Sequence, residues 1–209
     1  MTVLPDYLAP GLRIVFCGTA VSTASAERGH YYAGPGNEFW SFLHRSGLTP
    51  VLLSPEEDSR VLEFGLGLTD LAKKTAASSD AGLDPHYDIN GFVERIERAA
   101  PRWLAFHGKT AARAASKALG QGSAVALGKQ SWTIGETPVF VVPSASAANR
   151  DPKRLEGRSN RVDWFRELAT TTGDLRLPGA RRLDRSTYVD DQLPPAHRCR
   201  RQGRRPRDL

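Results

Sequence analysis

Short apolar runs occur along the chain at intervals that suit the strands of a buried sheet. Leu12–Cys17 is largely apolar and is followed by Gly18, which predicts a buried strand that stops at the glycine. Residues 103–106, 131–134 and 139–142 have the same character and predict three further strands. Such short, unbroken runs are typical of strands that are covered on both faces.

Helical periodicity falls between these runs. Asn37 is predicted to cap a helix that extends to Arg45, with Gly47 as its stop signal. Residues 91–100, 110–119 and 162–168 predict three further helices. Strands that alternate with helices indicate a parallel sheet covered on both faces, so we predict an α/β fold: a three-layer sandwich with a central, mainly parallel sheet flanked by helices.

One long stretch, Pro50–Ala76, has no clear periodicity. Its glycines Gly65 and Gly67 indicate a tight backbone path, and no regular element is predicted there.

Three predicted strands are followed by loops of small polar residues, namely Gly18–Ser22, His107–Lys109 and Pro143–Arg150. In an open parallel sheet these loops lie on one edge, beyond the carboxyl ends of the strands, where ligands bind. Small side chains let a ligand approach the backbone closely. The sequence therefore predicts a binding site built from these three loops.

Length and charge divide the chain into a domain and an appendage. The 209 residues suit one domain with an extension, since a domain has about 150 residues. Of the net charge of +6, residues 172–209 carry +5, from ten arginines and five aspartates. We therefore predict a globular domain over residues 1–171 and an arginine-rich tail over 172–209. The tail is interpreted either as an arm that binds phosphates or as a solvated extension.

The remaining composition narrows the class of protein. No apolar run reaches the length of about 18 residues that a membrane span needs, and no secretion signal is recognised, so we expect a cytoplasmic location. Cys17 and Cys199 are expected to be free thiols. Two cysteines and five histidines without ligand spacing predict no metal site.

Several segments together resemble the uracil-DNA glycosylase superfamily, and most closely its mismatch-specific uracil/thymine branch. The longest is Gly-Pro-Gly-Asn-x-Phe-Trp at residues 34–40. The resemblance covers roughly residues 10–170 and leaves out the tail. The segments that carry it, in order along the chain, are Val15–Gly18, Gly29–Trp40, Ser46–Leu48, Gly65–Leu71, Leu104–Lys109 and Pro143–Ala147.

This resemblance implies a monofunctional glycosylase. Such an enzyme flips a damaged base out of DNA and hydrolyses the N-glycosidic bond, which leaves an abasic site. It implies no metal and no cofactor, a monomer whose partner is uracil-containing DNA, and, in a bacterium, association with the nucleoid. The alternative is a relative that binds lesions or abasic sites but no longer cleaves.

The resemblance also implies roles for individual residues. Tyr32 corresponds to an aromatic residue that stacks on the flipped base, although packing in the core is an alternative. Asn37 either contacts the base or only caps its helix. Ser144 and Ser146 correspond to serines beside the extruded nucleotide, and Lys109 is a candidate contact to DNA. Substrate contacts are also assigned to the first loop, at Gly18, Thr19, Ala20 and Ser22.

Two positions depart from the family pattern. Ala20 stands where relatives have the asparagine that positions the attacking water. Ala148 stands where relatives have a wedge residue, and the adjacent Asn149 and Arg150 are candidates to contact DNA instead. The small residues Ala20, Gly34 and Ala145 indicate a roomy pocket that accepts bases larger than uracil.

Asp70 is the first candidate to replace the missing asparagine, because a carboxylate can orient water and stabilise a developing oxocarbenium ion. The alternative is that Asp70 caps a short helix beginning at Leu71. His107 is the second candidate, although a lone histidine at a strand end is more often a hydrogen-bonded core residue.

Removing residues 172–209 is expected to weaken DNA binding at low salt and to leave the single-turnover cleavage rate nearly unchanged. Each phosphate contact adds about 0.9 to the salt dependence of binding to duplex DNA. The measurement is the DNA dissociation constant of the full and shortened chains as a function of salt. An unchanged slope would show that the tail does not contact DNA.

Overall fold

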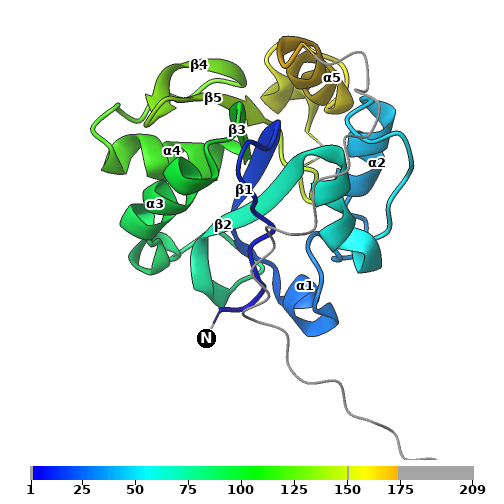
Figure 1. Cartoon of the computed structure of the whole chain (residues 1–209), viewed down its shortest axis with the longest axis horizontal. Coiled ribbons are helices and arrows are strands. Elements are labelled where there is room, and N and C mark those ends of the chain that lie inside the picture. The colour runs from blue at the N-terminus through cyan, green and yellow to red at the C-terminus, as the bar shows by residue number, and fades with distance from the viewer. Residues whose placement is uncertain (1, 150, 174–209) are drawn as a thin grey trace, which may run out of the picture.

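The computed structural model describes residues 2–149 and 151–173 and contains one five-stranded sheet (Figure 1). The strand order is β2-β1-β3-β5-β4; β4 is antiparallel to β5, and the other pairs are parallel. This confirms the predicted α/β fold with a mainly parallel sheet. The strands are β1 (Ile14–Val21), β2 (Leu66–Ala76), β3 (Trp103–His107), β4 (Gly128–Ile134) and β5 (Thr137–Val142).

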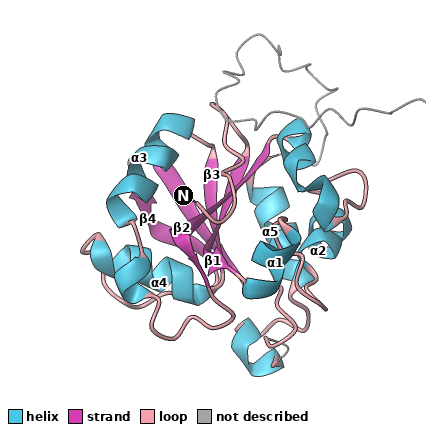
Figure 2. Cartoon of the chain, turned by 90° about the horizontal axis from the view of Figure 1, so that it is seen from below, coloured by secondary structure: helices cyan, strands magenta, loops and turns pink. Residues whose placement is uncertain are grey.

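Helices cover both faces of the sheet, which is seen nearly edge-on in Figure 2. Helices α3 and α4 lie on one side, and α1, α2 and α5 lie on the other. Their bounds are α1 (Thr23–Arg28), α2 (Phe39–Arg45), α3 (Ile89–Ala99), α4 (Lys109–Ala118) and α5 (Val162–Thr171). Three short 3-10 helices complete the description: η1 (Pro55–Phe64), η2 (Asp84–His86) and η3 (Pro152–Leu155). None of the helices described is long and apolar enough to cross a membrane.

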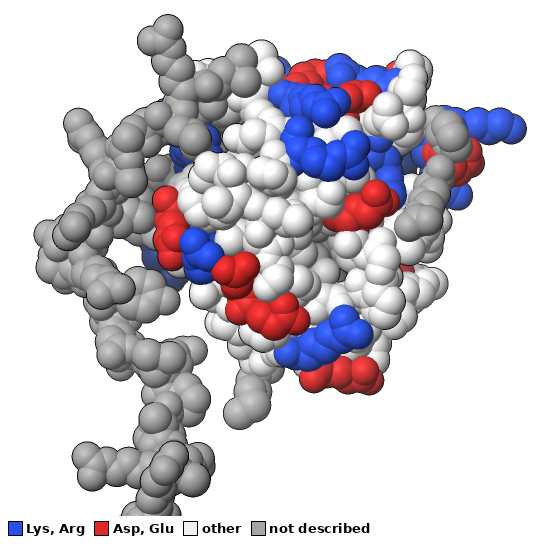
Figure 3. Space-filling view, turned by 90° about the vertical axis from the view of Figure 1, so that its right-hand side faces the viewer, with Lys and Arg blue, Asp and Glu red and all other residues white. Residues whose placement is uncertain are grey.

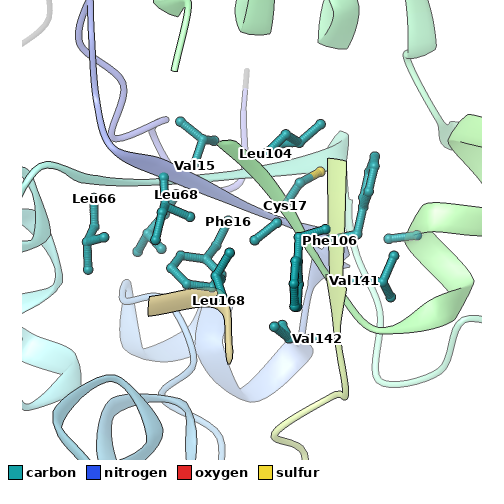
Figure 4. Close-up of a cluster of buried hydrophobic side chains, with 14 of the residues drawn as sticks. Val15, Phe16, Cys17, Leu66, Leu68, Leu104, Phe106, Val141, Val142 and Leu168 are labelled. Carbon is teal, nitrogen blue, oxygen red and sulfur yellow. The ribbon is translucent and has the colours of Figure 1, made fainter. Parts of the chain in front are cut away.

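The core lies on both faces of the central strands (Figure 4). Phe16 of β1 packs against Phe39 of α2 and Phe165 of α5, with ring centroids 5.3 and 6.1 Å apart. On the other face, Phe106 of β3 packs against Phe92 of α3 at 5.8 Å. Aromatic pairs at these separations add about 1 kcal/mol each to the burial of their area, so they fix the helices firmly on the sheet.

The first strand is longer than its sequence predicts. It continues through Gly18 to Val21, because β2 extends beside it and pairs Gly18 with Asp70 and Ala20 with Ala72. The expectation that Gly18 ends the strand is therefore wrong. Gly18 is an extended residue within the sheet, and the loop begins at Ser22.

The stretch without predicted structure contains both η1 and β2. Gly65 ends η1 with a φ of 68°, a left-handed conformation that favours glycine, and β2 follows at once. Asp70 therefore lies inside a strand, and the alternative that it caps a helix beginning at Leu71 is wrong. The chain from Leu66 to Ala72 pairs with β1, so it is a strand and not a helix at this point.

Strand β2 is flanked on its outer edge by the N-terminal segment. Tyr7 pairs with Leu68, and the Val3 amide donates to the Lys73 carbonyl at 2.8 Å. A Cβ on Gly67 would lie 2.7 Å from the Tyr7 carbonyl oxygen, so this close approach requires glycine. The segment therefore covers a strand edge and brings its own side chains against β2.

Candidate active site

A cleft of about 950 Å³ opens at the carboxyl ends of β1, β3 and β5, as the three-loop prediction requires. With the exception of Ala145, every described residue that the sequence analysis proposed for the site lines this cleft. They are Gly18, Thr19, Ala20, Ser22, Tyr32, Asn37, Asp70, His107, Lys109, Ser144, Ser146, Ala148 and Asn149. Arg150 lies outside the described residues, as do residues 174–209 of the predicted tail. Ala145 is fully buried and does not line the cleft, so it adds no room to it.

Asp70 projects from β2 over Gly18 of β1. A Cβ built on Gly18 would lie 2.5 Å from Asp70 Oδ1, so any side chain at position 18 would force this carboxylate to move. Asp70 is 3% exposed, and its Oδ2 is buried without a hydrogen-bond partner among the described residues. A buried polar atom left unpaired costs about 1–3 kcal/mol. This atom therefore marks a place where a polar group of a ligand or a water is to be expected.

Burial raises the pKa of Asp70 to about 6. Lys73 and Arg95 oppose this rise because they favour the charged carboxylate, and the backbone N–H of Gly18 acts in the same direction, whereas Asp6 adds to the rise. A carboxyl group with this pKa changes its protonation near neutral pH, which is the range in which acid–base groups work best.

Tyr32 supplies a flat ring at the wall of the cleft. Its φ of 54° is left-handed, a conformation that costs a tyrosine about 1 kcal/mol or more. Its ring stacks on Phe39 with centroids 3.8 Å apart and meets His107 edge-on at 4.9 Å. The hydroxyl is buried without a partner in the described part of the chain, and burial, with Asp70 as the next cause, raises its pKa. The ring is thus part of the core on one face and of the cleft at its edge.

His107 ends β3 and holds the neighbouring loop. Its Nε2 accepts a hydrogen bond from the Ala145 backbone N–H at 2.8 Å. Burial lowers the pKa of His107 to about 3, with Arg161 as a further cause. The imidazole is therefore neutral, and its accepting nitrogen is already engaged with the backbone.

Two residues that the sequence analysis did not single out fix the loop after β5. The Arg161 guanidinium donates to the carbonyls of Ser144 and Ser146 at 3.0 and 2.8 Å and forms an ion pair with Glu38. The Glu38 amide in turn donates to the Ala145 carbonyl at 3.0 Å. The signal in the sequence is weak, because Glu38 and Arg161 lie 123 positions apart.

Several of the polar residues in the cleft also support its local structure. Asn37 Oδ1 accepts from the Phe39 amide at 3.0 Å, but the N-cap of α2 is Glu38, so the expectation that Asn37 itself caps the helix is wrong by one residue. The Asn37 side chain holds the turn that leads into α2, and its Nδ2 remains as a donor. Ser22 caps α1 through the Ser25 amide. Ser144 Oγ accepts from the Ser146 amide, and Ser146 Oγ accepts from the Ala148 amide, so both serines shape the turn.

Charged residues at the rim are mostly paired. Lys109 forms an ion pair with Glu156, and Asn149 Oδ1 accepts from Arg154 at 3.3 Å. Figure 3 likewise shows basic and acidic side chains next to one another on the face that it displays. Arg113 and Lys153 line the cleft as exposed cations. Among residues 2–149 and 151–173, no three His, Cys, Asp or Glu side chains gather in a way that could hold a metal ion.

Comparison with known proteins agrees with this geometry. Residues 5–169 match the model of the uracil DNA glycosylase superfamily. The chain belongs to this superfamily. A solved structure with a similar fold is the NMR structure of a Methanosarcina acetivorans protein described as a "putative Uracil DNA glycosylase", which superposes with a TM-score of 0.53. Its sequence is 24% identical, and the match covers 79% of this chain and 96% of that one, which supports the shared fold.

Within this superfamily fold, Ala20 and Asp70 come from neighbouring strands at the same end of the cleft. Ala20 pairs with Ala72, two residues beyond Asp70, and both Ala20 and Asp70 line the cleft. The carboxylate thus lies one strand away from the position that lacks a polar side chain.

Asp70→Asn is expected to stabilise the protein at high pH and much less at low pH. A pKa of about 6 in place of 3.8 means that the folded state retains a proton that the unfolded state releases. Stability therefore falls as pH rises from about 4 to 6, by about 3 kcal/mol in total. Asparagine has no charge to bury and avoids this loss.

The measurement is the free energy of unfolding of both proteins at pH 4 and pH 8. The difference between variant and wild type should change by about 3 kcal/mol in favour of the variant at pH 8. A difference that does not vary with pH would contradict the raised pKa.

Proposed function

We propose that this protein is a monofunctional uracil-DNA glycosylase of the mismatch-specific branch. It flips uracil out of DNA into the cleft and hydrolyses the N-glycosidic bond, leaving an abasic site. The observation that carries the proposal is the buried, unpaired Oδ2 of Asp70 within a cleft that also presents the Tyr32 ring. We further propose that it acts as a cytoplasmic monomer without metal or cofactor, associated with the nucleoid if the source is bacterial.

Asp70 performs the step that Ala20 cannot. The ionised carboxylate orients a water toward the anomeric carbon and stabilises the positive charge that develops on the sugar. As the water oxygen bonds to that carbon, the bond to the base breaks and the base leaves with the electron pair. The carboxylate takes the proton of the water, and the base anion is protonated later.

Tyr32 and Asn37 hold the departing base. One face of the Tyr32 ring packs on Phe39, and the part of the ring that lines the cleft is the surface against which a base packs. Asn37 uses Oδ1 to accept from the Phe39 amide at the start of α2, and its Nδ2 is the end that donates to a base oxygen. The hydrogen bond to the Phe39 amide and the contact to the base are thus compatible in one side chain. Charge that develops on the leaving base is stabilised by such fixed donors.

The cleft suits bases larger than uracil as well. Ala20 and Gly34 line it with minimal side chains, and a Cβ added to Gly34 would lie 3.6 Å from Ser22 Oγ. Ser144, Ser146, Ala148 and Asn149 form the loop that follows the DNA backbone in this proposal. Lys109 contributes to DNA binding only when its ion pair with Glu156 opens.

Asp70→Asn is expected to lower the single-turnover rate of uracil excision by about 10²-fold or more, because proton transfer by a positioned group contributes 10²–10⁴-fold. In the wild type, the rate should fall as pH drops below about 6, the pKa at which Asp70 becomes protonated. The measurement is single-turnover cleavage of a uracil-containing duplex from pH 4.5 to 8.5.

Asp80→Asn is the matched control. Asp80 also lines the cleft, but it is exposed and its Oδ1 accepts from Thr19 at 2.6 Å. The Asp80→Asn variant should cleave at the same rate as the wild type. Normal cleavage by Asp70→Asn would reject Asp70 and direct attention to His107. Tight binding of lesion DNA with no cleavage by the wild type would instead support a protein that only recognises lesions or abasic sites.

A further inference from the structure

A group of buried and half-buried charges lies against the strand that carries Asp70. Lys73, three residues along β2, is 7% exposed, and its Nζ lies 2.8 Å from Asp6 Oδ1. Arg95 of α3 approaches the other oxygen of Asp6, with Nε 3.3 Å from Oδ2. Thr69 donates to Asp6 Oδ1 at 2.7 Å. We call Asp6, Lys73 and Arg95 the β2 charge cluster.

The β2 charge cluster contains two cations and one carboxylate. Ionised Asp70 supplies the second negative charge, so the four groups together are neutral. If Asp70 were protonated, an excess positive charge would remain in a poorly solvated place, which is costly. Asp88 lies 3.7 Å from Arg95 but is 61% exposed, so solvent weakens its contribution. The two cations of the cluster therefore favour the ionised form of Asp70, whereas burial favours the protonated form.

The same cluster is joined to the aromatic wall of the cleft. Lys73 Nζ donates to the Tyr31 hydroxyl at 3.0 Å, and the Tyr31 amide donates to buried Asp58 at 2.9 Å. Tyr31 directly precedes Tyr32, whose backbone is left-handed. Arg95 donates to the Asp70 carbonyl at 3.2 Å. Asp70 is thus connected to the β2 charge cluster through its backbone carbonyl, and Tyr32 is connected through the adjacent Tyr31.

We propose that Lys73 is a positioning residue that, held by Asp6 and Tyr31, keeps the Asp70 carboxylate ionised and the Tyr32 segment in place. This inference rests on the proposed function of Asp70. Lys73 does not touch the reacting atoms; it acts through the neighbouring carboxylate and tyrosine.

The electrostatic directions at Asp70 agree with this role. Lys73 is the largest influence that lowers the pKa of Asp70, and Arg95 acts in the same direction, whereas Asp6 raises it. His107 and Asp80 line the same cleft as Asp70, but burial lowers the pKa of His107 to about 3, so it is neutral, and Asp80 is exposed to solvent. The thiol of Cys17 on β1 and the hydroxyls of Tyr31 and Tyr32 also lie near Asp70, and burial raises the pKa of all three. These three groups stay neutral near pH 7. Lys73, Arg95 and Asp6 are therefore the charges that control Asp70.

The test uses two substitutions with opposite expected signs. Lys73→Met should move the titration midpoint of Asp70 upward by about one pH unit, and Asp6→Asn should move it downward. Lys73→Arg, which keeps the charge, should restore a midpoint near that of the wild type. If Lys73→Met does not fold, Lys73→Gln removes the charge while it retains donors toward Asp6 and Tyr31. The midpoint is read by carbon NMR of the Asp70 carboxyl in the full chain without DNA.

Single-turnover cleavage is then measured across pH with the same variants. The acidic limb should follow the NMR midpoint, upward for Lys73→Met and downward for Asp6→Asn, so that at pH 6 Lys73→Met cleaves several-fold more slowly. A purely structural role would change stability without moving the midpoints in opposite directions. Folded variants with an unmoved Asp70 midpoint would overturn the inference. Midpoints that move as expected, with cleavage that ignores them, would support the control by Lys73 and reject the catalytic role of Asp70.

Discussion

The parallel pairing of β1 with β2 is the interaction on which the site depends. It extends both strands beyond the point where β3 still pairs, and it places Gly18 opposite Asp70. Because Gly18 has no side chain, the carboxylate lies directly over the backbone of β1 and remains almost fully buried. The raised pKa, the unpaired oxygen and the access to the cleft all follow from this one contact.

The fold could be predicted where burial produces a regular apolar pattern. The runs around Ile14 and Trp103 form strands as expected, because their residues are apolar and their structure is determined by burial in the core. The sequence does not predict strand β2, because its buried positions include the polar residues Thr69, Asp70 and Lys73 and therefore break the apolar pattern. These residues belong to the site and to the charge cluster beside it. Sequence rules fail most often at functional positions, where local preference is sacrificed to chemistry.

The lining of the cleft could likewise be predicted, because strand ends and the family resemblance both point to it. The residues that support this lining could not. Arg161 and Glu38 meet across 123 positions, and Asp6 reaches Lys73 from the N-terminal segment. Nothing in the local sequence marks such partners, since each is an ordinary charged residue until the fold brings it to its neighbour.

The left-handed backbone of Tyr32 has a consequence for how this protein can change over time. Glycine would adopt that conformation without strain, so the backbone alone favours a change of Tyr32 to glycine by about 1 kcal/mol. The ring, however, forms a wall of the cleft. It also stacks on Phe39 in the core, so replacement by glycine would lose more packing energy than the relieved strain returns. A descendant released from selection for base binding is therefore expected to keep a large apolar residue at this position.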